Sequence, residues 1–205
     1  MRIIGVTGPS GSGKSLLSKY FSDLGVTVID ADALYHSMLI PPSPCLDAIR
    51  EKFGDGVISA DGSLDRSALS KVVFNSPEKL RLLNRTVLTL VLDEIRARLR
   101  ALEADGVETV IIDAPTLIES GFHLECDTVV SVIAPVDDRI ARICHRDGIS
   151  REKATERVRA QKEDSFYTEH SQEVVLNDST EEAFTERLSA LARTLKIFKS
   201  TPREE

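Results

Sequence analysis

A glycine-rich stretch near the N-terminus is the feature that most limits what this chain can fold into. Residues 8–15 read Gly-Pro-Ser-Gly-Ser-Gly-Lys-Ser, which is the pattern G-x-x-x-x-G-K-S. The apolar residues 2–7 before it predict a buried strand, and the apolar spacing of residues 14–24 after it predicts a helix. A strand, this loop and a helix in that order are typical of a P-loop, which binds nucleoside triphosphates.

Each part of the pattern has a physical task in holding phosphates. Glycines let successive backbone N–H groups turn inward around phosphate oxygens, and the helix N-terminus adds donors and a partial positive charge. Lys14 can reach the β- and γ-phosphates, where it would also assist catalysis, and the Ser15 hydroxyl can ligate Mg²⁺. We therefore predict that ATP and Mg²⁺ bind through Ser10, Gly11, Ser12, Gly13, Lys14 and Ser15.

The rest of the chain predicts one α/β domain. Apolar strands are expected at 2–7, 26–29, 109–112, 128–133 and 174–176, and helices alternate with them. Strands of this kind belong to a parallel sheet that helices cover on both faces. Further helices are expected at about 136–147 and 150–163, and a last helix, which Ser179 and Glu182 would cap, ends near Leu195.

The segment between the second and third strands is much longer than a minimal crossover between parallel strands. Residues 34–104 are expected to be mainly helical, with one long helix from Pro77 to about Leu102. We interpret this segment as a helical substrate lobe. The domain then divides into a core (about 1–33, 105–138 and 170–195), the lobe (about 34–104), a lid (about 139–165) and a polar tail (196–205).

The composition argues against several other classes of protein. The 205 residues contain no apolar run long enough to span a bilayer and no recognisable signal peptide. We therefore expect a cytoplasmic protein without a membrane partner. A net charge of −7 argues against a nucleic-acid partner. The three cysteines and four histidines lack metal-ligand spacing, so a structural zinc site is not expected.

Two groups of acidic residues follow expected strands. Asp30 and Asp32 come at the end of the second strand, where period-2 alternation would put both on one face. Ligands of open α/β sheets bind at that edge, so Asp32 is our candidate general base, with helix capping by Asp32 as the alternative. Asp113 ends the third strand and is a candidate to position Mg²⁺, and Glu119 is a candidate to line the same cleft.

A basic segment stands out in this acidic chain. Residues 139–162 contain eight Lys or Arg and three Asp or Glu, a net charge of +5. One interpretation is a solvated helical face. The other is a lid whose arginines close over phosphates and exclude water, since phosphoryl transfer requires positive charge at the transferred group. The candidates are Arg142 and Arg146, which share a helix face at i, i+4, and Arg157.

An ordered set of motifs resembles the dephospho-coenzyme A kinase family over about residues 2–195. The set begins with the P-loop from Gly5 to Ser15 and with Val-Ile-Asp-Ala-Asp-Ala at 28–33. It continues with Leu64-Asp65-Arg66, then Val73-Phe74, and Asp113-x-Pro115-x-x-x-Glu119. It ends with Arg142-x-x-x-Arg146-Asp147, Arg157-x-x-x-Gln161 and Asn177.

The resemblance implies both a fold and a reaction. The fold is a P-loop nucleoside-triphosphate hydrolase type, with a five-stranded parallel sheet, a helical substrate lobe and a lid. The reaction is ATP-dependent phosphorylation of the ribose 3′-hydroxyl of dephospho-CoA, the final step of coenzyme A synthesis, by a monomer or weak homo-oligomer. Asp32 matches the family's general base and Arg142 a catalytic arginine. Arg146 and Asn177 would bind ATP, and the acceptor would contact Asp32, Arg66, Asp113, Glu119, Arg157 and Gln161.

Two alternatives stay open. Pro9-Ser10, Pro42, Leu88-Thr89 and Gln172 depart from residues that are usual in the family, so a P-loop kinase for another nucleoside or nucleotide is one alternative. A nucleotide-switched binding protein such as a GTPase is the other. Such proteins usually carry an N-K-x-D motif, and this sequence has no Asn-Lys dipeptide.

Overall fold

The computed structural model describes residues 1–198, so the part of the expected polar tail from 199 to 205 lies outside the described residues. The chain divides into two compact units, each described here by itself. Unit 1 comprises Met1–Ile29 and the chain from Gly106 onward, and unit 2 comprises Asp30–Asp105. From the sequence, the helical segment was expected at about 34–104, so its expected start is four residues later and its expected end one residue earlier.

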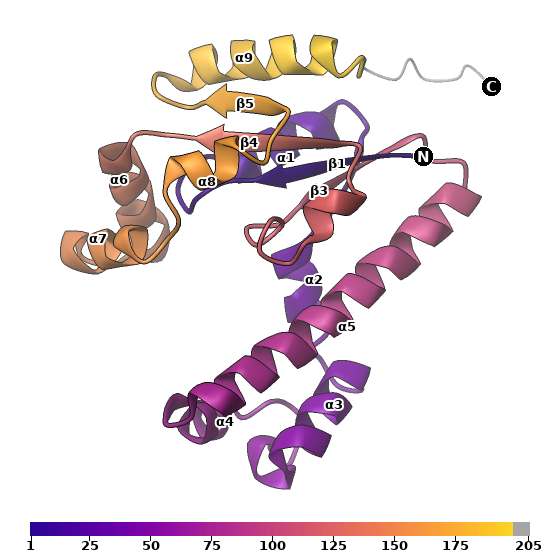
Figure 1. Cartoon of the computed structure of the whole chain (residues 1–205), viewed down its shortest axis with the longest axis vertical. Coiled ribbons are helices and arrows are strands. Elements are labelled where there is room, and N and C mark those ends of the chain that lie inside the picture. Colours follow the sequence, from indigo (N-terminus) through magenta and orange to yellow (C-terminus); the bar gives the residue numbers. More distant parts are fainter. Residues whose placement is uncertain (199–205) are drawn as a thin grey trace. The chain divides into compact units, whose positions relative to one another are not determined.

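A five-stranded sheet forms the centre of unit 1, as predicted. Its strands are β1 (Arg2–Thr7), β2 (Thr27–Asp30), β3 (Thr109–Asp113), β4 (Thr128–Ile133) and β5 (Glu173–Leu176). They lie in the order β2-β3-β1-β4-β5, and β1 pairs in parallel with both β3 and β4. Since β1 is the central strand, the loop that follows it leaves the middle of the sheet's carboxyl edge (Figure 1).

One face of this sheet carries the main core of unit 1. Side chains alternate along each strand, so Val130 and Val132 of β4 enter this core. Helices α1 (Lys14–Asp23) and α9 (Glu181–Thr194) cover it, and they also contact each other. Phe21 of α1 and Phe184 of α9 are almost completely buried there. The helix that begins at the P-loop is therefore anchored by apolar packing.

The opposite face of the sheet packs against shorter elements. Tyr167 of α8 (Asp164–Thr168) lies in a small cluster with Ile118 and Ile133. Ser131 of β4 donates a hydrogen bond to the Tyr167 carbonyl oxygen at 3.1 Å. The remaining elements of unit 1 are the short 3₁₀ helix η2 (Phe122–Glu125), α6 (Val136–Asp147) and α7 (Arg151–Arg159).

Several details of unit 1 differ from the sequence predictions. The second expected helix of the lid ends at Arg159, not 163, and the short helix α8 was not predicted. The last helix is capped by Thr180, whose hydroxyl accepts from the Ala183 N–H at 3.3 Å, and not by Ser179. Ile197 is buried in the main core, so the expected polar tail begins later than residue 196.

Unit 2 is mainly helical, as expected. It contains α2 (Ala31–Ser37), α3 (Pro44–Phe53), η1 (Asp55–Val57), α4 (Arg66–Phe74) and the long α5 (Pro77–Ala104). Both α3 and α4 pack on α5 around a separate apolar core (Figure 1). Polar side chains fix where these helices begin: Ser43 caps α3, Asp65 caps α4 and Ser76 caps α5. None of the helices within residues 1–198 meets the length and apolarity needed to cross a membrane.

The packing of α1 gives a direct prediction. Phe21 is 0% exposed, so Phe21→Ala removes a fully buried ring and leaves a cavity. We expect a loss of about 3–5 kcal/mol in the free energy of unfolding, measured by urea denaturation. The control is Leu16→Ala on the exposed side of the same helix, with an expected change within about 0.5 kcal/mol. Equal losses in the two variants would contradict this packing.

Candidate functional site

The loop between β1 and α1 is built on glycines that no other residue can replace without strain. Gly8 has φ +137°, and a Cβ atom added to it would lie 2.3 Å from the Val132 carbonyl oxygen of β4. Gly13 has φ +111°, and its added Cβ would lie 2.3 Å from the side-chain nitrogen of Asn177. Positive φ angles and these close approaches both require glycine. The two glycines thus let the loop turn tightly against β4 and Asn177.

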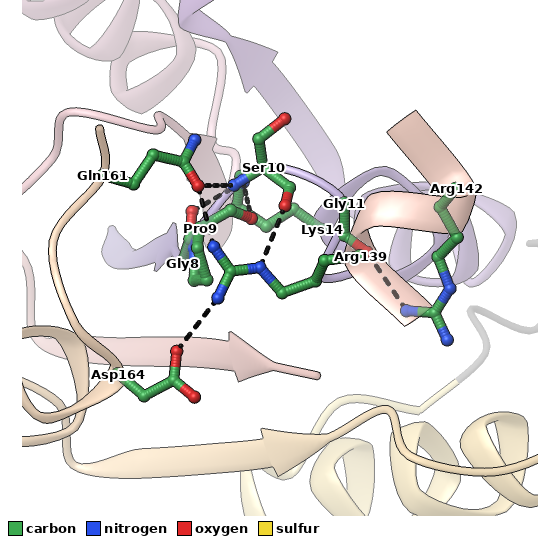
Figure 2. Close-up of polar contacts among 9 residues, drawn as sticks. All are labelled: Gly8, Pro9, Ser10, Gly11, Lys14, Arg139, Arg142, Gln161 and Asp164. Atoms are coloured by element: carbon green, nitrogen blue, oxygen red, sulfur yellow. Dashed lines mark hydrogen bonds and ion pairs between the residues drawn. The ribbon is translucent and has the colours of Figure 1, made fainter. Parts of the chain in front are cut away.

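Side chains from later in the chain hold the carbonyl groups of this loop. Arg142 of α6 donates to the carbonyl oxygens of Gly11 and Ser12 at 3.1 and 3.3 Å. Asn177, which is buried just after β5, donates to the Ser12 carbonyl at 2.8 Å. Arg139 of α6 donates from Nε to the Ser10 carbonyl at 3.2 Å (Figure 2). Three consecutive carbonyl groups therefore face nitrogen donors.

These contacts determine which way the amide groups of the loop point. In a planar trans peptide, the carbonyl and the following N–H point in opposite directions. Because the carbonyls of Ser10 and Ser12 face Arg139, Arg142 and Asn177, the N–H groups of Gly11 and Gly13 point to the other side. Amides turned to one side of a loop make a concave site for anions.

Lys14 lies across the start of the loop. Its Nζ donates to the carbonyl oxygens of Gly8 and Pro9 at 2.7 and 3.2 Å. The Pro9 carbonyl also accepts from the Ser12 N–H at 3.3 Å, which closes a turn. The ammonium group is therefore held by the loop itself, with its positive charge at the mouth of the anion site.

Asp113, the candidate metal-positioning residue, ends β3 and is only 7% exposed. Its carboxylate accepts from the Ser18 hydroxyl of α1 at 2.6 Å. Ser15 and Ser18 are three residues apart and share one face of α1. A hydroxyl and a carboxylate are the hard oxygen ligands that suit Mg²⁺, which usually completes its shell with water and phosphate oxygens. The residues present therefore fit this ion. Ser18 was not predicted from the sequence.

The candidate arginines of the basic segment have different partners. Arg142 contacts the loop, whereas Arg146 donates to both oxygens of the neighbouring Asp147 at 2.7 and 3.0 Å. Arg157 of α7 pairs with the same carboxylate. The hydrogen bonds from Arg146, reinforced by Arg157, hold the pKa of Asp147 at about 2. The face of α6 that meets the loop therefore carries Arg139 and Arg142, not the predicted pair Arg142 and Arg146.

Gln161 also lies at the loop. Its side-chain oxygen accepts from the Ser10 N–H at 3.1 Å and from Arg139 at 2.8 Å. Gln161 was expected among the acceptor-binding residues, and Arg139 had no individually predicted role. The sequence feature that could have identified Arg139 is its position three residues before Arg142, on the same side of an amphipathic helix.

The two candidate aspartates, Asp30 and Asp32, do not lie where the strand pattern predicted. Asp30 ends β2, and its carboxylate caps α2 by accepting from the Ala33 N–H at 2.9 Å. Asp32 is an exposed residue in the first turn of α2. The prediction that both lie on one strand face is wrong, because the helix begins at Ala31. The alternative that Asp32 caps the helix is also wrong, because Asp30 does so.

The other acceptor-side candidates are exposed. Arg66 is the first residue of α4. It lies near enough to Tyr35 to offset part of the rise that burial produces in the tyrosine pKa. Glu119 follows β3 in unit 1, where its charge contributes to the raised pKa of Tyr167. Within the described residues, no group of three or more His, Cys, Asp or Glu has the geometry to hold a metal ion.

Comparisons with known proteins agree on one family. The model of the dephospho-CoA kinase family matches residues 2–182. A dephospho-CoA kinase from Carboxydothermus hydrogenoformans is 36% identical over 159 residues, which are 78% of this chain and 77% of that protein.

Solved structures show the same fold. A Thermus thermophilus protein superposes with a TM-score of 0.77 at 31% identity, over 95% of this chain and 97% of that one. The dephospho-CoA kinase from Campylobacter jejuni superposes with a TM-score of 0.71 at 22% identity, over 95% and 98% of the two chains. At that identity the second likeness supports the fold alone.

The pairing of Asp147 with two arginines predicts how acid affects stability. A pKa lowered from 3.8 to about 2 in the folded protein means that this carboxylate stabilises the fold above pH 4. That contribution is lost as the pH falls through about 2. We expect the gap in unfolding free energy between the unmodified protein and Asp147→Asn to be constant above about pH 5 and to shrink below pH 4. Urea denaturation across this range measures it, and a constant gap down to pH 2 would contradict the prediction.

Proposed function

Because the chain belongs to the dephospho-CoA kinase family, we infer that it transfers the γ-phosphoryl group of ATP to the ribose 3′-hydroxyl of dephospho-CoA. The products are coenzyme A and ADP. The observation that carries this inference is the match of the family model to residues 2–182, which includes both the P-loop and Asn177 behind it. A kinase for another nucleoside or nucleotide is the less favoured alternative, since the curated relative described above has the family's name.

The nucleotide half of the reaction follows from the geometry of the loop. We propose that ATP phosphates accept hydrogen bonds from the amides of Gly11 and Gly13, with Lys14 beside them at the β- and γ-phosphates. Ser15 and Asp113 would hold Mg²⁺, which neutralises phosphate charge when it is bound. Arg142 and Asn177 keep the loop carbonyls turned away from the phosphates. Their contribution is to remove electrostatic repulsion from the anion site.

The acceptor half of the reaction rests on the resemblance. Asp32 would orient the ribose hydroxyl and accept its proton, which makes the oxygen a better nucleophile for in-line attack. Its exposed position in the first turn of α2 leaves the carboxylate accessible. Arg66, Glu119, Arg157 and Gln161 are proposed to contact the acceptor, and Arg146 the nucleotide. Arg142 and its neighbours would stabilise the charge on the transferred group.

The proposal includes a cytoplasmic location, small molecules as the only partners and a monomer or weak homo-oligomer as the active form. Cys45, Cys126 and Cys144 are all free thiols, which is typical of proteins in a reducing compartment.

The test of the function is a coupled ADP-release assay with Mg-ATP. The acceptors are dephospho-CoA, adenosine, AMP, CMP and pantetheine phosphate. We expect rapid turnover with dephospho-CoA alone, and loss of transfer in Lys14→Ala, because the charge at the β- and γ-phosphates is removed. Turnover with a different acceptor alone would overturn the proposed substrate and retain the kinase. Retained transfer in Lys14→Ala would contradict the role of the loop.

A second variant tests the proposed base. Asp32→Asn keeps the size of the side chain and removes its ability to accept a proton, so we expect kcat to fall by about 100-fold or more. The Kd for ATP should change little, because Asp32 is assigned to the acceptor. The matched control is Asp47→Asn, at an exposed carboxylate on α3. Near-normal kcat in Asp32→Asn would remove this residue as the base.

A further inference from the structure

We propose that Arg139 is a positioning residue for the nucleotide site. Together with Gln161 it forms a clamp that binds both the N–H and the carbonyl oxygen of Ser10. The clamp thereby fixes the direction of the peptide that leads into the loop. This inference builds on the proposed function only in taking ATP as the ligand. Neither residue needs to touch the nucleotide for the clamp to act.

The clamp has three hydrogen bonds around one residue. Arg139 Nε donates to the Ser10 carbonyl at 3.2 Å, and the Ser10 N–H donates to the Gln161 side-chain oxygen at 3.1 Å. Arg139 Nη2 donates to that same oxygen at 2.8 Å, which closes a ring of contacts (Figure 2). Both polar groups of the Ser10 backbone therefore face the clamp, and neither faces the anion site.

The sequence of the loop explains why Ser10 needs this support. Pro9 has no N–H, and its carbonyl points toward Lys14 and the Ser12 N–H. The next peptide must point the opposite way, because the Gly11 N–H is needed on the phosphate side. The chain thus reverses its peptide direction at Ser10. Without partners on the outer side, the partly buried polar groups of this reversal would lose their hydrogen bonds, which is costly.

Arg139 is suited to this task by its burial and charge. Its side chain is only 3% exposed. The remaining terminal nitrogen donates at 3.3 Å to the carboxylate of Asp164, a side chain that is 44% exposed. Burial lowers the pKa of Arg139, and Asp164 partly offsets that effect. A guanidinium offers several donors in one rigid plane, so it can bind a carbonyl, an amide oxygen and a carboxylate together. A lysine has the charge without this geometry.

The clamp also joins three parts of unit 1 that are far apart in sequence. Ser10 belongs to the loop, Arg139 to α6, and Gln161 and Asp164 to the connection and first residue of α8. The position of the predicted lid segment and the direction of the Ser10 peptide are therefore linked by two side chains. A change in either side chain should therefore alter the affinity of the loop for a nucleotide.

The test is ATP binding measured by isothermal titration calorimetry, which does not depend on the identity of the acceptor. The variants are Arg139→Met, Arg139→Lys, Gln161→Leu and the double variant Arg139→Met with Gln161→Leu. The charge-matched control is Arg151→Met, at an exposed arginine of the same basic segment that pairs with exposed Asp137. We expect Arg139→Met and Gln161→Leu each to weaken ATP binding about 10-fold, and the control to be unchanged.

The pattern across variants separates positioning from other roles. If the two residues act as one clamp, the losses are not additive in the double variant, and Arg139→Lys restores less than half of the loss. Normal binding by Arg139→Lys, or additive losses, would overturn the proposal. A lowered Tm with unchanged ATP affinity in both single variants would reduce Arg139 to a structural role. Gln161→Leu keeps the test informative if Arg139→Met does not fold. If no acceptor is phosphorylated but ATP binding changes across the variants as expected here, only the proposed substrate is overturned.

Discussion

The nucleotide site depends on how the carbonyl groups of a short glycine loop are held from outside. A loop that presents amide hydrogens to phosphates must turn its carbonyl oxygens the other way, and those oxygens need donors. Arg139, Arg142 and Asn177 supply them to Ser10, Gly11 and Ser12. The sheet and α1 place the two ends of the loop, and these three side chains determine the direction of the peptides between them.

Positive charge in this site therefore has two different tasks. Lys14 lies on the inner side of the loop, where an anion would meet it. Arg139 and Arg142 lie on the outer side, where they donate to carbonyl, amide and carboxylate oxygens of the protein. Arg146 and Arg157 both pair with Asp147. Two arginines of the basic segment thus help to build the loop itself.

Much of the fold follows from the sequence, because apolar strands and a glycine loop have local signals. The five strands and their parallel arrangement, the P-loop and the mainly helical nature of residues 34–104 were predicted. The start of α2 was missed, since a strand ending on Asp30 and a helix capped by Asp30 have the same local sequence. Arg139, Gln161 and Ser18 could not be given their roles, because their partners lie 95 to 151 residues away along the chain. Such pairings depend on tertiary packing, which local periodicity does not encode.

The separation between the loop and its outer donors has a consequence during synthesis. The glycine loop leaves the ribosome well before its outer donors, because Arg139 and Asn177 follow Ser10 and Ser12 by 129 and 165 residues. At about 5–20 residues per second, the loop waits roughly 6 to 33 seconds before its carbonyl partners are made. A nascent chain that ends before Arg139 contains the entire glycine motif but lacks the groups that orient it. The ability to bind nucleotide should therefore arise only after these later residues are made, although the glycine motif is made earlier.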